Sequence, residues 1–157
     1  MNGSVPERSV LEWLASAATE PEAWLRAVER APHRAAPLPC GRRWDVLVLP
    51  ARLGPPTLEV LRGLVPAPGP VLGDLGEGDT GRVGFLVPVG TAGCWLGTGV
   101  RCAGEGERVP VPHPARNTGP GVRWLSAPDG SGRLVDPRLL ELAMHEAAIR
   151  MVPVGSR

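Results

Sequence analysis

The sequence predicts an α+β protein with a mixed, mainly antiparallel central sheet that is packed by N-terminal helices and a C-terminal helix. Two observations predict this class. Apolar residues recur at helical spacing near both ends of the chain, and short apolar runs bounded by glycine and proline fill its middle. The 157 residues suit one domain. We expect a flexible N-terminus over residues 1–8, a single domain over residues 9–152 and a tail over residues 153–157.

The N-terminal part predicts two helices. Val10, Leu11 and Leu14 are among the residues at helical spacing in the first, which we expect over Ser9–Ala18. The second is expected to start at Thr19-Glu20-Pro21-Glu22, which has the form of a capping box with a proline in the first turn. It should end near Arg30, and the proline-containing stretch that follows is interpreted as a connector.

The middle of the chain predicts strands separated by short helical elements. Trp44–Leu49 is an apolar run that is stopped by Pro50, as a buried strand would be. Pro55 and Pro56 preset the first turn of a short helix. Further strands are expected at Val71-Leu72, Arg82–Val87, Gly99–Cys102, Arg108–Val111 and Val122–Ser126, with a helical turn at Thr91–Leu96.

The chain closes with the helix that is best marked in the sequence. Asp136 suits the N-cap, and Pro137 suits the first helical position. The residues that share one face of this helix are Leu139, Leu140, Ala143, Met144, Ala147 and Met151.

Composition limits the function classes. The 17 basic residues, which are all arginine, nearly balance the 16 acidic ones, so the chain has no polybasic or acidic tail. The absence of lysine fits a GC-rich genome, so the arginine count alone is weak evidence of phosphate binding. Three cysteines predict reduced thiols, and no apolar run is long enough to span a membrane. We expect a cytoplasmic protein with no membrane partner.

Two loop motifs carry possible chemistry, each with a simpler explanation. Gly76–Gly81 matches G-x-G-x-x-G, yet a strand pattern follows it in place of the helix that a phosphate cradle needs, so a hairpin turn is the simpler reading. Asp74, Glu77 and Asp79 offer oxygen ligands to a divalent cation, but solvated acids in a turn are commoner.

The clearest binding candidates are arginines in the second half of the chain. Residues 81–134 carry an excess of basic charge, with Trp95 and Trp124 among them. A sheet face that combines guanidinium groups with an aromatic plane can hold single-stranded nucleic acid or a nucleotide. The alternative is that the tryptophans are core residues and the arginines are ordinary surface. The binding candidates are Arg82, Arg101, Arg116, Arg123 and Trp124.

One segment resembles a known family. Arg101–Pro114, followed by Gly119, Gly121 and Arg123-Trp124-Leu125, resembles the part of bifunctional primase/polymerase (Prim-Pol) domains in which a glycine-rich turn leads into a strand. The chain as a whole is similar to short stand-alone actinobacterial proteins of this kind. The resemblance implies a Prim-Pol-like fold, and it adds His113, from the Pro-His-Pro element, to the binding candidates.

The sequence departs from this family at the catalytic positions. Family members hold two divalent metals ~4 Å apart with strand-borne carboxylates, whereas the strand that would end in Asp-x-Asp ends here in Val48-Leu49-Pro50. We therefore assign no catalytic, metal or cofactor residue and expect a degenerate module that binds a nucleotide, a nucleic acid or a protein. One alternative is an active nucleotidyltransferase with Mg²⁺ or Mn²⁺ on Asp45, Asp74 and Asp79. Another is a regulatory protein-interaction module with no nucleotide ligand.

Overall fold

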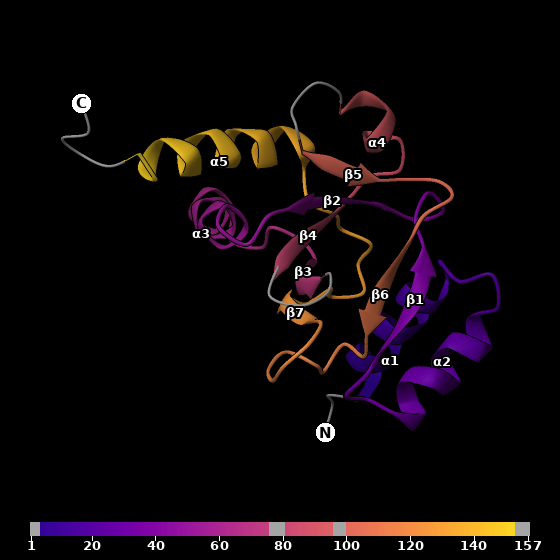
Figure 1. The fold of residues 1–157 in the computed structure, drawn as a ribbon. Coiled ribbons are helices and arrows are strands. Elements are labelled where there is room, and N and C mark those ends of the chain that lie inside the picture. The colour runs from indigo at the N-terminus through magenta and orange to yellow at the C-terminus, as the bar shows by residue number, and fades with distance from the viewer. Residues whose placement is uncertain (1–3, 76–80, 96–99, 153–157) are drawn as a thin grey trace.

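The computed structural model describes residues 4–75, 81–95 and 100–152, and it has the predicted α+β architecture (Figure 1). No helix in these three ranges has the length and apolar character needed to cross a membrane. In chain order the elements are α1 Ser4–Ala15, α2 Pro21–Arg30, β1 Ala35–Pro39, β2 Asp45–Leu49, α3 Gly54–Leu64, β3 Val71–Leu75, β4 Arg82–Val87, α4 Thr91–Cys94, β5 Arg101–Ala103, β6 Arg108–Pro112, β7 Arg123–Ser126 and α5 Pro137–Arg150.

Five strands form the central sheet, in the order β5-β2-β4-β3-β7. Every neighbouring pair in this sheet is antiparallel. Strands β1 and β6 form a separate antiparallel pair in which Leu38 lies opposite Val109. Because β4 is antiparallel to both β2 and β3, β2 and β3 run in the same direction. Their C-terminal residues therefore lie at the same end of the sheet.

Successive side chains of a strand point to opposite faces of the sheet. In the central sheet, a core cluster covers each of these two faces. On one face, Val46 and Leu86 join a core cluster with α1, α2, β1 and β6. On the other face, Leu47 and Phe85 join a second cluster with α3 and α5. The predicted packing by N-terminal helices and a C-terminal helix is confirmed, and α3 shares the second face with α5.

Helix α5 begins as its sequence predicts. Asp136 is the N-cap, and its carboxylate accepts a hydrogen bond from the backbone N–H of Arg138 at 2.8 Å. Pro137 occupies the first helical position, where its missing N–H has no partner to lose. The buried face consists of Leu140, Ala143, Met144 and Ala147.

The N-terminal helices differ from their predicted form. Helix α1 occupies Ser4–Ala15, so it includes part of the segment expected to be a flexible terminus and stops before Ala18. Helix α2 has Glu20 as its N-cap, with no side-chain hydrogen bond to the first turn, so the predicted capping box is not formed.

Strand β1 lies in the segment that was interpreted as a connector. Its two prolines argue against a strand, since proline cannot donate to a ladder. The structure accommodates them because Pro37 lies opposite Pro110 of β6, at a position where neither residue needs an N–H. The ladder hydrogen bonds of β1 therefore run through Ala36 and Leu38.

Candidate functional site

Three of the predicted arginines meet at one end of the central sheet. Arg82 begins β4, Arg101 begins β5 and Arg123 begins β7. In the register, Arg101 lies opposite Val48 near the end of β2, and Arg82 lies opposite Leu75 at the end of β3. Strands β5 and β4, and likewise β4 and β7, are separated by one intervening strand, which spaces these backbone positions by about 10 Å. We call Arg82, Arg101 and Arg123 the arginine end.

A surface hollow joins two members of the arginine end. Arg82 and Arg101 line a hollow of about 450 Å³ together with Val48, Pro50 and Val100. Both arginines are exposed, so their guanidinium groups are accessible to a ligand in the hollow. The floor is apolar apart from backbone atoms, so the charge that the described side chains bring to the hollow is positive.

Carboxylates accompany two of the three arginines. Arg123 donates from Nη1 to Oδ2 of Asp74 at 2.5 Å, and Arg101 makes an ion pair with Glu107. Arg82 has no ion pair with any of the residues that the structure describes. The Arg123–Asp74 pair is half-buried, whereas the Arg101–Glu107 pair is largely exposed. Exposed ion pairs contribute ~0–1 kcal/mol, so a phosphate can compete for the guanidinium group of Arg101 at small cost.

Arg116 does not belong to the arginine end. It lies in the loop between β6 and β7, where its Nη2 donates to the carbonyl oxygen of Pro120. Its carbonyl accepts a hydrogen bond from the backbone N–H of Trp124 at 2.8 Å. A Cβ atom at Gly119, whose φ is +91°, would lie 2.9 Å from Nη1 of Arg116, so the loop closes around this side chain. Arg116 therefore stabilises its own loop.

The two aromatic candidates are buried. Trp124 is 2% exposed, belongs to the core cluster on the α1 and α2 side, and donates from Nε1 to the carbonyl oxygen of Pro112 at 3.2 Å. His113 is 9% exposed, and its Nδ1 accepts a hydrogen bond from the backbone N–H of Ala115 at 3.0 Å. The expected sheet face of arginines around an aromatic plane is not formed, because core clusters cover both faces of the sheet.

Two of the three carboxylates of the alternative enzyme hypothesis, Asp45 and Asp74, lie far apart. Asp45 begins β2 opposite Val87, whereas Asp74 lies beside the pairing of Leu75 with Arg82, so the two acids lie at opposite ends of the sheet. Asp79 lies outside the described residues. Within the described ranges, no group of three or more His, Cys, Asp or Glu side chains is arranged to hold a metal ion.

Asp45 anchors the turn before α4. It is 2% exposed, and its Oδ2 accepts hydrogen bonds from the backbone N–H groups of Gly90 at 3.0 Å and Ala92 at 2.9 Å. Burial, and then the charge of Asp45, raise the pKa of Cys40 and of Cys102 to about 12. Both thiols, the buried one of Cys40 and the half-buried one of Cys102, are thereby kept protonated near neutral pH.

The sequence carries a partial signal for the arginine end. Arg82 is the first residue of the predicted strand Arg82–Val87 and Arg123 is the second residue of the predicted strand Val122–Ser126, whereas Arg101 lies inside the predicted strand Gly99–Cys102. The carboxylate partners Asp74 and Glu107 had no comparable signal, since their contacts depend on strand pairing.

In comparisons with known proteins, no family model, no curated protein and no solved structure matches this chain. The resemblance to primase/polymerase domains stays a prediction.

Proposed function

We propose that the chain is a non-catalytic, primase/polymerase-like module that binds single-stranded nucleic acid through the arginine end. The observation that carries the proposal is that Arg82, Arg101 and Arg123 begin three strands at the same end of one sheet. Guanidinium groups bind phosphate oxygens with paired N–H donors and stay charged at all physiological pH values. Three guanidinium groups at one end of the sheet match a ligand with repeated phosphates.

The buried position of Trp124 supports recognition of phosphates in preference to bases. Sequence-tolerant binding of single strands elsewhere relies on aromatic rings that stack on bases, and this ring is packed in the core. We therefore expect little dependence of affinity on base sequence and a strong dependence on salt.

The positions of the acidic residues support the non-catalytic part of the proposal. Nucleotidyl transfer by two metal ions needs carboxylates that converge on ions ~4 Å apart. Asp45 holds two backbone N–H groups at the far end of the sheet, and Asp74 is engaged by Arg123.

The test of binding is fluorescence anisotropy of a labelled single-stranded DNA across a salt series. With three phosphate contacts, the slope of log K against log salt should be about −2 for the native chain. In the double variant R82A/R101A the slope should fall by about 1.4. The matched control is R26A/R30A, which removes two exposed arginines of α2. Equal losses in the two variants, or no binding of the native chain at low salt, would overturn the proposal, and the latter would favour a protein partner.

The test of catalysis is primer extension with Mn²⁺ and deoxynucleoside triphosphates. We expect no incorporation. Metal-dependent incorporation that disappears in D74A would overturn the non-catalytic assignment.

A further inference from the structure

A second cavity is lined by residues of α2 and β1 together with Arg108 of β6. These elements are labelled in Figure 1. Its volume is about 490 Å³, which falls within the ~300–1,000 Å³ typical of small-molecule sites. Trp24, Ala23 and Ala27 of α2 form an apolar wall. None of the residues of the arginine end lines this cavity.

The β1 side of the cavity offers hydrogen-bond acceptors and few donors. Because the β1 ladder with β6 runs through Ala36 and Leu38, the carbonyl groups of Pro37 and Pro39 point to the opposite edge of the strand. Both prolines line the cavity, and neither has an N–H. No described donor outside the ladder bonds to these two carbonyls. A ligand at this edge has to supply the donors, and a second β-strand, which needs both donors and acceptors, cannot pair here.

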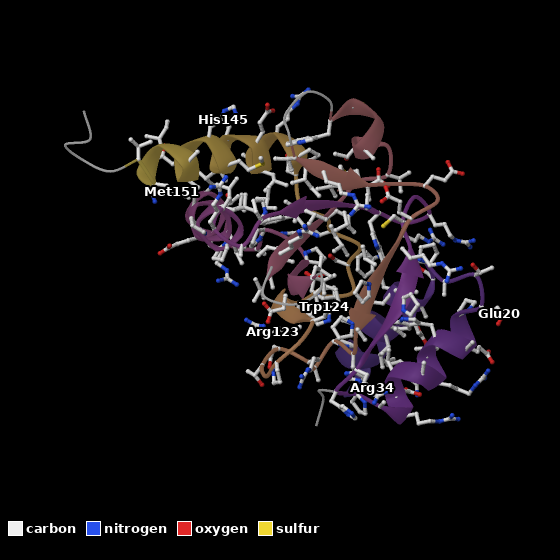
Figure 2. All side chains as sticks on the ribbon, in the orientation of Figure 1. Glu20, Arg34, Arg123, Trp124, His145 and Met151 are labelled. Carbon is white, nitrogen blue, oxygen red and sulfur yellow. The ribbon has the colours of Figure 1, made fainter. Side chains whose placement is uncertain are left out.

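Two opposite charges line the same cavity without pairing with each other. Glu20, labelled in Figure 2, is the N-cap of α2, and its carboxylate makes no capping hydrogen bond. Arg108 begins β6 opposite Pro39. Both residues are exposed, and neither has an ion pair with any described residue. The cavity wall therefore carries a carboxylate, hydrogen-bond acceptors and a guanidinium group beside apolar surface.

We propose that this cavity binds a small zwitterion with an apolar side chain, of the class of the apolar amino acids. Its ammonium group donates to Glu20 and to the carbonyl edge of β1, and its carboxylate is bound by the guanidinium group of Arg108. Its side chain packs against Ala23, Ala27 and Trp24. The cavity walls complement each of these three parts of the ligand.

The test is isothermal titration calorimetry of the full chain with leucine, leucine methyl ester and N-acetyl-leucine. The ester lacks the carboxylate, and the acetylated form lacks the ammonium group. We expect saturable binding of leucine with a Kd near ~1 mM and at least tenfold weaker binding of either derivative. Absence of saturable binding in the millimolar range, or equal binding of all three compounds, would overturn the proposal.

Variants locate the site and separate it from the arginine end. E20Q and R108Q should each weaken leucine binding at least tenfold, whereas E22Q and R26Q, which change exposed charges of α2 outside the cavity, should leave it unchanged. Circular dichroism of each variant reports whether it is folded. R82A/R101A should bind leucine normally, so binding at the cavity and binding at the arginine end are tested independently. Equal effects of E20Q and E22Q would show that the ligand binds elsewhere.

Discussion

The guanidinium group of Arg123 donates to the carboxylate of Asp74 at 2.5 Å and so joins the start of β7 to the end of β3. Asp74 has a φ of +58°, the left-handed conformation, which few residues other than glycine, asparagine and aspartate adopt readily. The register between β3 and β4 also shifts between Leu72 and Leu75. This irregularity places a negative charge within the arginine end.

Replacing Asp74 by asparagine should increase the affinity for single-stranded DNA. Asparagine tolerates the left-handed backbone, so D74N removes the charge and keeps the turn. Because Arg123 already counts among the three phosphate contacts, the slope of log K against log salt should stay near about −2, while the affinity at fixed salt rises as Arg123 is released from its carboxylate. The anisotropy titration above measures this change. E59Q, an exposed acid of α3, is the control; equal strengthening in E59Q would show that only net charge matters.

Replacing Trp124 by phenylalanine should lower stability and leave nucleic-acid affinity unchanged. The variant loses the hydrogen bond from Nε1 to Pro112 and leaves a small void in the core, at a cost of about 1–3 kcal/mol. Urea unfolding measures the free energy, and anisotropy measures the affinity. A tenfold loss of affinity in a folded W124F would contradict the assignment of this ring to the core.

Alkylation should distinguish the three thiols. Cys94 is exposed and should react first with iodoacetamide, while Cys40 and Cys102 should react slowly at pH 8. Because burial and Asp45 raise the pKa of both slow thiols to about 12, the thiolate fraction increases tenfold with each pH unit below that value. Peptide mass spectrometry measures the rates. D45N should accelerate Cys102 only partly, since burial is the larger cause. Equal rates at all three cysteines would contradict this account.

Two glycine substitutions should change stability in opposite directions. A Cβ atom at Gly84 would lie 2.4 Å from Cδ1 of Leu75 and 2.9 Å from Cγ1 of Val46, so G84A should cost about 1–3 kcal/mol through overpacking. A Cβ atom at Gly63, in the last turn of α3, would meet nothing within 4 Å. G63A should therefore stabilise the protein by about 0.5–1 kcal/mol. Thermal unfolding measures the stability of each variant. The result for G84A tests the close packing between β3 and β4.

Elements with local signals were predictable from the sequence. The Asp136 cap and the apolar run of β2 each depend on residues that are close in sequence. Strand β1 was missed because its prolines are acceptable only opposite Pro110, which is a long-range pairing.

The candidate site was predictable only in part, because it also depends on long-range strand pairing. The sequence singled out Arg82, Arg101 and Arg123, but alternation along a strand indicates a face and does not indicate which strand ends meet. Antiparallel pairing brings these ends together. Burial of Trp124 likewise depends on segments that are distant in the chain.

The pairing of β1 with β6 has a consequence for how the protein folds during synthesis. Leu38 leaves the ribosome well before its partner Val109, and at ~5–20 residues per second the delay is several seconds. During that time α1, α2 and β1 lack the strand that completes their shared core. These N-terminal elements can therefore pack fully only after β6 has been synthesised. Contacts so distant in sequence slow the folding of the whole domain.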